Sequence, residues 1–138
     1  MIFLDSWIWL EFLFDGEQAD EAAAVIQQAD SADEVGLITP TVIAEVSYRV
    51  RVVDGEETAT EAVRAIRDYD HIESLPLVDE IAEYAAELRY KYYDRGSREL
   101  SYADCIHLAT ASVHDDCRAL YSGDPDFADV DEIDVVLL

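Results

Sequence analysis

Short apolar runs alternate along this chain with longer stretches in which apolar residues recur every three or four positions. The short runs are bounded by polar or turn-forming residues, which is the pattern of strands buried on both faces of a sheet. The longer stretches have the period of a helix, and some begin at a capping residue or a proline. Strands are therefore predicted at residues 2–4, 35–38, 71–75, 119–121 and 133–138, and helices at residues 6–14, 17–30, 40–53, 56–70, 78–93 and 100–114.

The alternation of strands and helices predicts an α/β fold. We expect a three-layer α/β/α sandwich around a mainly parallel sheet of about five short strands. The 138 residues fit one domain, and no repeat or low-complexity segment interrupts them. Ligands of open parallel sheets bind at the carboxyl ends of the strands. Residues that directly follow the predicted strands are therefore the first candidates for a functional site.

Acidic residues are in large excess. The chain has 32 Asp and Glu against 9 Lys and Arg, for a formal net charge of −23. These acids are scattered among a normal share of apolar residues, unlike those of a disordered acidic protein or an acidic tail. Molar salt shortens the Debye length to about 3 Å and screens such repulsion. We therefore expect a halophilic, archaeal protein; the alternative, attraction of a basic partner, would concentrate the acids in one patch.

The cysteines and the hydrophobic profile indicate a cytoplasmic protein. Cys105 and Cys117 lie too far apart for a CxxC motif and are expected to be buried thiols without a disulfide. The apolar start contains Asp5, has no basic leader and is too short to cross a bilayer. Neither a signal peptide nor a membrane segment is expected.

Four acids stand where a parallel sheet would bring them together. Asp5 and Asp124 each follow a predicted strand, Glu45 lies in the helix after a strand, and Asp104 lies in the helix before one. Glu45 and Asp104 also fall on the apolar sides of their helices, where a carboxylate is costly unless it is paired or bound to metal. We expect all four to meet at the carboxyl edge of the sheet.

Structural explanations also exist for the two helix acids. Glu45 could pair with Arg49 one turn later, and Asp104 could close a capping box with Ser101 at the start of its helix. His107 lies three residues after Asp104, but a histidine on a helix face is more often a satisfied core residue. We therefore do not predict His107 as a site residue.

The acids near residue 124 have a similar alternative. Asp124 could cap the turn that begins at Pro125, and Asp126 could be an acid of its first turn. The joint placement of the four acids nevertheless favours a metal site. Several oxygen ligands without a matching His or Cys cluster suit Mg²⁺ or Mn²⁺.

Four segments of the chain together resemble the PIN domain. They are Ile-Phe-Leu-Asp-Ser from residue 2, Thr-Pro-Thr-Val-Ile-Ala-Glu-Val from residue 39, Leu-Ser-Tyr-Ala-Asp-Cys-Ile-His-Leu-Ala-Thr-Ala from residue 100, and Tyr-Ser-Gly-Asp-Pro-Asp-Phe from residue 121. They occur in order over essentially the whole chain. Within the family, they are most similar to the VapC-type toxin ribonucleases of prokaryotic toxin–antitoxin pairs.

This resemblance implies a metal-dependent endoribonuclease that hydrolyses RNA phosphodiester bonds with Mg²⁺ or Mn²⁺. Family members commonly form homodimers and are silenced by a small antitoxin protein. The chain departs from the family in its acidity and in lacking a basic residue beside Asp124. The implied site residues are the acids Asp5, Glu45, Asp104 and Asp124, with Asp126 as a supplement or substitute, and the hydroxyl residues Ser6 and Ser122.

A basic–tyrosine segment, residues 89–98, is a candidate RNA contact. Guanidinium groups and aromatic faces are what single-stranded RNA uses for phosphate contact and base stacking. The alternative is a solvated helix end with its tyrosines in the core or in a dimer interface. The basic residues of the segment are Arg89, Lys91, Arg95 and Arg98, and its tyrosines are Tyr90, Tyr92 and Tyr93.

The main alternative function is a PIN-like module that binds RNA or protein without cleavage. The presence of all four acids argues against it, because a degenerate member would be expected to lose one. A haloacid-dehalogenase-type phosphatase needs a second Asp at the position of Trp7. A response-regulator receiver needs a Lys after a late strand, whereas the chain's one Lys, Lys91, lies in a predicted helix.

Overall fold

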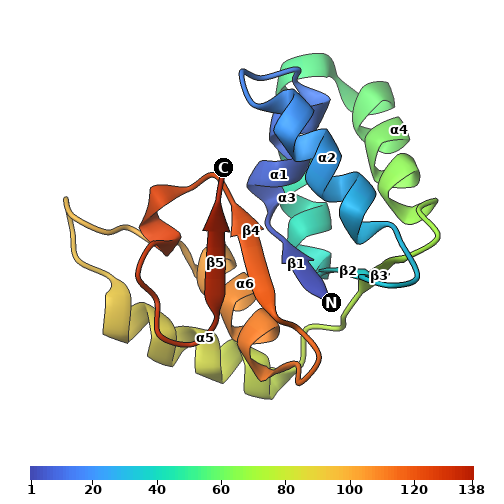
Figure 1. The fold of residues 1–138 in the computed structure, drawn as a ribbon. Helices are drawn as coiled ribbons and strands as arrows, with labels where there is room; N and C mark the ends of the chain where they lie inside the picture. Colours follow the sequence, from blue (N-terminus) through green and yellow to red (C-terminus); the bar gives the residue numbers. More distant parts are fainter.

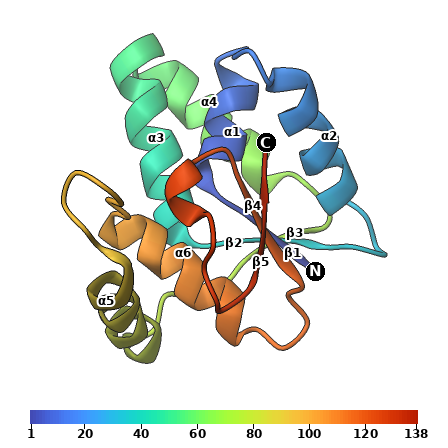
Figure 2. The ribbon, with the colours of Figure 1, turned by 60° about the vertical axis from the view of Figure 1, so that its left-hand side comes forward.

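A computed structural model describes residues 1–138 and contains six α-helices and five strands (Figures 1 and 2). The strands are β1 (Ile2–Leu4), β2 (Gly36–Ile38), β3 (Ile72–Ser74), β4 (Ala119–Ser122) and β5 (Asp134–Leu137). The helices are α1 (Ser6–Leu13), α2 (Ala19–Ala29), α3 (Pro40–Asp54), α4 (Glu56–Arg67), α5 (Asp79–Tyr92) and α6 (Tyr102–Val113), with a short 3₁₀ helix η1 (Pro125–Phe127). Each predicted element is therefore present.

The five strands form one parallel sheet in the order β3-β2-β1-β4-β5. β1 is central, and Phe3 lies in register with Leu37 of β2 and Leu120 of β4. All residues of β1, β2 and β4 are buried, as their unbroken apolar runs predict, whereas the edge strands β3 and β5 are more exposed. The sheet confirms the predicted parallel α/β fold.

The helices form two groups. α1 packs against α2 and α3, and α3 packs against α4, while α5 packs against α6. Figures 1 and 2 show α5 and α6 together, away from α2 and α4. α6 contacts β1 and β4, and α1 contacts β4, so the central strands are covered by helices of both groups. This arrangement is the predicted three-layer sandwich.

The carboxyl edge of the sheet gathers the ends of several elements. Asp5 directly follows β1, and its backbone N–H donates to the carbonyl of Tyr121 in β4 at 3.1 Å. α3 begins nearby at Pro40, after Thr39, whose Oγ1 accepts a hydrogen bond from the N–H of Val42 at 3.4 Å. Short connections at this edge bring residues from distant parts of the sequence together.

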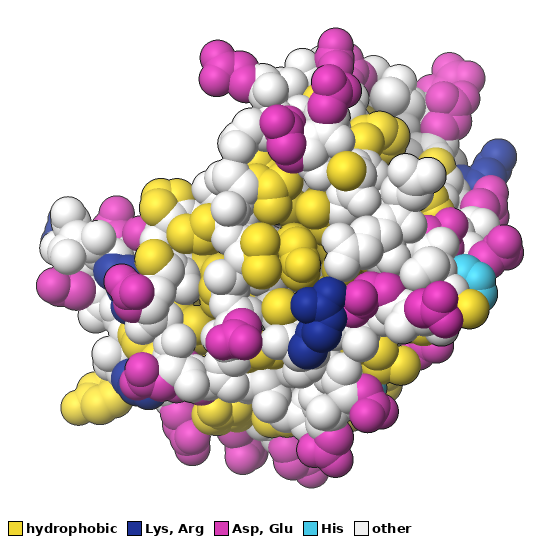
Figure 3. All heavy atoms as spheres, in the orientation of Figure 1, with side chains coloured by type: hydrophobic (Ala, Val, Ile, Leu, Met, Phe, Trp, Pro, Cys, Tyr) yellow, Lys and Arg dark blue, Asp and Glu magenta, His cyan; other side chains and the backbone are white.

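The acidic residues, the cysteines and the helices can each be compared with the sequence. Acidic side chains are distributed over the face in Figure 3 rather than gathered into one patch. Both cysteines are free, with Cys105 buried and Cys117 half-buried. None of the helices has the length and apolar character that a membrane span requires.

Candidate metal centre at the carboxyl edge of the sheet

Asp5 is buried at the end of β1, with 2% of its surface exposed. Its Oδ1 lies 2.8 Å from Nδ1 of His107, and its Oδ2 accepts a hydrogen bond from Oγ of Ser122 at 2.7 Å. Burial alone would raise the pKa of Asp5. The hydrogen bond and charge of His107, together with the hydroxyl of Ser122, outweigh burial and lower the pKa. Asp5 is therefore held as a carboxylate.

His107, on α6, is fully buried between two acids. Its Nε2 lies 3.3 Å from Oε1 of Glu45, but the two atoms are not aligned for a hydrogen bond, and each lacks another partner. Burial would lower the pKa of His107, but the hydrogen bond and charge of Asp5, with the charge of Glu45, raise it. The expectation that His107 is an ordinary core residue is therefore wrong, because it links β1 to α3.

Glu45 and Asp104 approach the same place from α3 and α6. Burial raises the pKa of Glu45, and the negative charges of Asp5 and Asp104 raise it further. Burial also raises the pKa of Asp104, again with a contribution from the charge of Asp5. Glu45 therefore senses the charges of both other acids and Asp104 senses that of Asp5, as expected when like charges share a poorly solvated site.

Asp104 also forms the capping box that the sequence offered as its structural role. Its Oδ2 accepts from the N–H of Ser101 at 2.7 Å, and its own N–H donates to Oγ of Ser101 at 3.1 Å, which completes a capping box. One carboxylate oxygen thus fixes the start of α6 while the carboxyl group remains beside Asp5. No ion pair joins Glu45 to Arg49, so the corresponding alternative for Glu45 is not observed.

Together, Asp5, Glu45, Asp104 and His107 form what we call the acid cluster. Asp5, Asp104 and His107 each offer a ligand atom, and these atoms lie within 4.8 Å of one another. The buried Oε1 of Glu45 has no hydrogen-bond partner. A cation would satisfy that oxygen and relieve the repulsion among three carboxyl groups, and carboxylate oxygens suit hard divalent ions. The residues therefore fit a divalent metal.

Ser122 connects the acid cluster to the loop after β4. Its buried Oγ donates to Asp5 and accepts from the N–H of Asp124 at 3.0 Å. Asp124 caps η1 through its Oδ1, which accepts from the N–H of Asp126 at 2.9 Å. Burial raises the pKa of Asp124, and the charges of Asp126 and Asp5 raise it further. Asp124 thus lies at the border of the site and also performs the structural role of a cap.

Asp126 points its carboxylate elsewhere. Its Oδ2 accepts a hydrogen bond from the N–H of Glu99 at 3.1 Å, so it fastens η1 to the loop before α6. Ser6, directly after Asp5, is buried, and its hydroxyl slightly lowers the pKa of Glu45 against the larger effect of burial. Roles of Ser6 and Asp126 at a metal remain predictions.

Trp7 and Gly123 border the site on the side of α1. The indole of Trp7 lies so close to Gly123 that a Cβ at this position would overlap the ring. Gly123 stands between Ser122 and Asp124, the two residues that lead from the acid cluster into η1. The close approach of Trp7 therefore fixes the backbone of the loop that carries Asp124.

Three of the four cations in the basic–tyrosine segment are engaged within the molecule. Arg89 donates to the carbonyl of Leu100, and Arg98 donates to the carbonyl of Asp126 at 2.8 Å. Arg95 is exposed. Lys91 donates hydrogen bonds to Asp131 and Glu132. Together with Tyr92, which contacts the same two residues, they form what we call the Tyr92 cluster. RNA contact by this segment stays a prediction.

The fold and the acid cluster together define a protein of the PIN class. The sequence profile of the PIN domain family matches residues 2–133, and the chain belongs to the PIN domain family. No match was found among curated proteins.

Several solved structures share this fold at low sequence identity. A chain of VapBC2 from Rickettsia felis, crystallised with a DNA fragment from their promoter, has 15% identity and a TM-score of 0.75, with 99% of this chain and 98% of that chain covered. VapC20 from Mycobacterium tuberculosis, described as a sarcin-ricin loop cleaving toxin, has 20% identity, a TM-score of 0.74 and 92% coverage of both chains. A toxin–antitoxin complex from Klebsiella pneumoniae has 23% identity and a TM-score of 0.66, with 99% and 96% covered.

Proposed function

We propose that this chain is a single PIN domain over residues 1–138 that acts as a metal-dependent endoribonuclease, the toxin of a toxin–antitoxin pair. The observation that carries the proposal is the convergence of Asp5, Glu45 and Asp104 on buried His107. A fold alone requires no such concentration of carboxyl groups, because burying them is costly without a counter-charge. A bound cation would balance the charge of the three acids, for which the chain supplies only His107.

Asp5, Glu45 and Asp104 would hold Mg²⁺ or Mn²⁺, with Asp124 as the fourth acid. When bound, such an ion stabilises negative charge on a phosphate and lowers the pKa of bound water. His107 and Ser122 orient the two oxygens of Asp5, since each contacts a different one. Ser101 fixes the carboxyl of Asp104 through the capping box. The chain's own groups thus hold the acids before any ion arrives.

The similar structures support the biological part of the proposal. VapC20 is described as a sarcin-ricin loop cleaving toxin, and the Klebsiella pneumoniae structure is described as a toxin–antitoxin complex. We infer a small antitoxin partner on the same basis. We propose a homodimer from the resemblance to the PIN family and a cytoplasmic location from the cysteines and the hydrophobic profile of the sequence. A net charge of −23 leads us to propose that the protein works in molar salt.

The test compares wild type with Asp5→Asn and Asp104→Asn in molar KCl. We expect millimolar Mn²⁺ to raise the melting temperature of the wild type and to permit cleavage of RNA. A ligand at a hundredfold excess over its Kd stabilises the folded state by about 2.7 kcal/mol. Both variants should lose the metal-dependent shift and the cleavage while remaining folded.

Asp115→Asn is the matched control, because Asp115 is an exposed loop residue outside the site. It removes the same charge and should leave both measurements unchanged. Equal cleavage by wild type and both site variants would refute the nuclease. A metal shift without cleavage of any RNA tested would favour the non-catalytic module instead.

A further inference from the structure

Four arginines on the hairpin of α3 and α4 make no ion pair, although the chain carries 32 Asp and Glu. They are Arg49, Arg51, Arg64 and Arg67. Arg51 donates to the hydroxyl of Ser47 at 3.4 Å, which leaves its charge unpaired. Cations that remain free of carboxylates in so acidic a molecule are available to an external anion.

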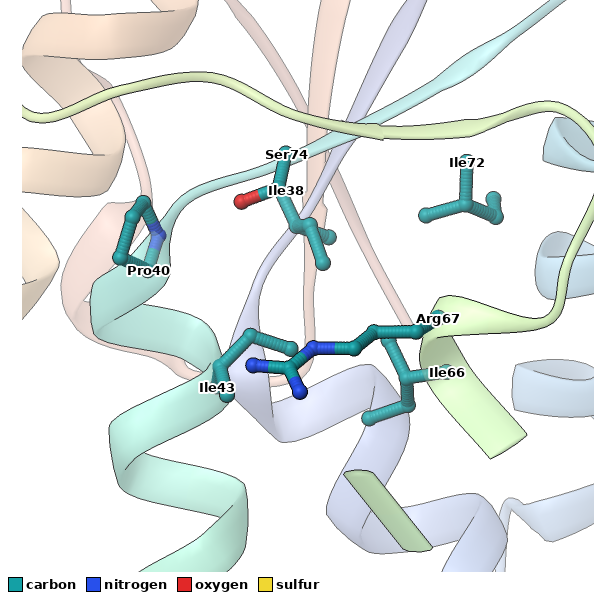
Figure 4. A pocket seen from close by; sticks show the side chains of 7 residues that line it. All are labelled: Ile38, Pro40, Ile43, Ile66, Arg67, Ile72 and Ser74. Carbon is teal, nitrogen blue, oxygen red and sulfur yellow. The ribbon is translucent and has the colours of Figure 1, made fainter. Parts of the chain in front are cut away.

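A cavity of about 320 Å³ opens beside Arg67 at the carboxyl ends of β2 and β3. Four isoleucines line it, and Figure 4 shows the guanidinium of Arg67 reaching from α4 across the cavity toward α3. Ser74, the last residue of β3, lies on its rim. The isoleucines are Ile38, Ile43, Ile66 and Ile72.

A second, polar hollow of about 360 Å³ adjoins Arg67. Arg64 and Arg67 line it together with the hydroxyl residues Ser47 and Thr60, and Asp68 is its one acid. Arg67 is thus shared between an apolar cavity and a hollow that offers a second guanidinium and hydroxyl donors. This combination matches a ligand with an apolar body attached to an anionic group.

The cavity and the acid cluster occupy the same edge of the sheet. β2 pairs with β1, and the cavity lies at the end of β2 while Asp5 follows β1. Neighbouring strands are only about 5 Å apart. On α3, Ile43 lines the cavity and Glu45 lies beside His107, so residues two positions apart on one helix border both places. A chain-like ligand could therefore occupy both places at once.

We propose that the cavity and Arg64 and Arg67 bind one nucleotide of the RNA next to the acid cluster, an inference that rests on the proposed function. The two guanidinium groups bind the phosphate, and the base enters the isoleucine cavity against the plane of Arg67. Arginine planes stack on unpaired bases, and guanidinium groups bind phosphate strongly. In molar salt, charge alone holds RNA weakly, so an apolar enclosure beside the cations maintains the contact.

The experiment measures binding of a short fluorescent single-stranded RNA to full-length protein in the Asp5→Asn background, across a KCl series. The double variant Arg64→Gln, Arg67→Gln should weaken binding by about tenfold or more. Its slope of log K against log[KCl] should become shallower by about 0.7, because the one phosphate contact that is lost contributes about 0.7 with single strands. Ser74→Leu, which narrows the cavity rim, should weaken binding without changing the slope.

Two control variants, each lacking one positive charge, distinguish binding at this site from nonspecific electrostatic attraction of RNA. Arg49→Gln removes an exposed, unpaired arginine of α3 that lines neither hollow, and Arg118→Gln removes an exposed arginine that directly precedes β4, at the opposite edge of the sheet. Both should leave affinity within about twofold of the background. Equal weakening by either control, or unchanged RNA binding in the double variant, would overturn the inference.

The inference and the nuclease can fail separately. RNA cleavage by wild type together with unchanged RNA binding in the double variant would overturn the nucleotide site and leave the nuclease intact. Loss of RNA binding in the double variant without cleavage by wild type would support the nucleotide site and refute the nuclease.

Discussion

The acid cluster and the Tyr92 cluster both gather charged side chains from distant parts of the chain, but they balance charge differently. In the Tyr92 cluster, Lys91 lies 2.7 Å from Glu132 and 3.2 Å from Asp131, and the hydroxyl of Tyr92 donates to Glu132 at 2.6 Å. That hydroxyl also accepts from the N–H of Asp131 at 2.9 Å. Both carboxylates therefore have donors within the molecule.

The acid cluster has three carboxyl groups around one imidazole, and buried atoms of Glu45 and His107 lack hydrogen-bond partners. In a cluster that only stabilises the fold, the buried polar atoms find hydrogen-bond partners within the protein. In a functional site, some of these atoms remain without a partner and can bind a ligand. The two clusters therefore differ in whether their polar atoms have hydrogen-bond partners, and not in how many charged groups they contain.

His107→Leu should have the largest effect on stability. It removes the one basic partner of two acids in the acid cluster, and loss of one partner from a buried pair costs about 3 to 5 kcal/mol. The free energy of unfolding in denaturant, with EDTA and constant KCl, measures the loss. His71→Leu, a half-exposed histidine before β3, is the control. A loss below about 1 kcal/mol would show that the acid cluster does not depend on the imidazole.

Gly123→Ala should cause the second-largest loss of stability. The added methyl group overlaps the ring of Trp7, and overpacking of this kind costs about 1 to 3 kcal/mol. The change should also weaken Mn²⁺ binding, because the same loop carries Ser122 and Asp124. Trp7→Leu in the same chain should recover part of the loss, as a double-mutant cycle of unfolding free energies would show. Additive effects would contradict a direct contact.

Tyr92→Phe should cost about 1 kcal/mol, since it removes hydrogen bonds of the Tyr92 cluster and leaves Lys91 paired with Glu132. Chemical unfolding measures this loss. Mn²⁺ affinity should not change, because the Tyr92 cluster does not contribute to the metal centre. A parallel loss of metal affinity would mean that the two clusters are coupled.

The smallest expected effect is on the pH dependence of the free energy of unfolding. Burial alone would raise the pKa of Glu132, but Lys91 and Tyr92 outweigh burial and lower it below its ordinary value of 4.5. A depressed pKa in the folded state stabilises the protein above pH 4.5, and this contribution is lost as the pH falls through the folded-state pKa. Glu132→Gln should flatten the acid side of the stability profile. An unchanged profile would exclude this contribution.

The sequence predicted the elements well because their signals are local. The apolar run of β1, the cap and proline before α3, and the Ser101–Asp104 capping box each act within a few residues. The meeting of Asp5 with Glu45 and Asp104 followed from one further rule, that parallel strands share a carboxyl edge. The order of elements was sufficient for this part of the site.

The partners of His107 and of the basic–tyrosine segment could not be predicted in this way. His107 meets Asp5 from 102 residues away, and the identity of its neighbours depends on how α6 packs over β1 and beside α3. Lys91 finds Glu132 across 41 residues, in a loop without periodic signal. The spacing of His107 from Asp104, one helical turn, was the available clue that both point the same way.

The contact of Trp7 with Gly123 has an evolutionary consequence. The indole of Trp7 lies against Gly123, which has no side chain. We therefore expect these two positions, 116 apart in sequence, to vary together. Relatives that keep a large aromatic residue at the first position should keep glycine at the second. Relatives with a small residue at the first should tolerate alanine or serine at the second. Substitutions at this pair should therefore appear together along lineages, as a correlated change that leaves the neighbouring acids untouched.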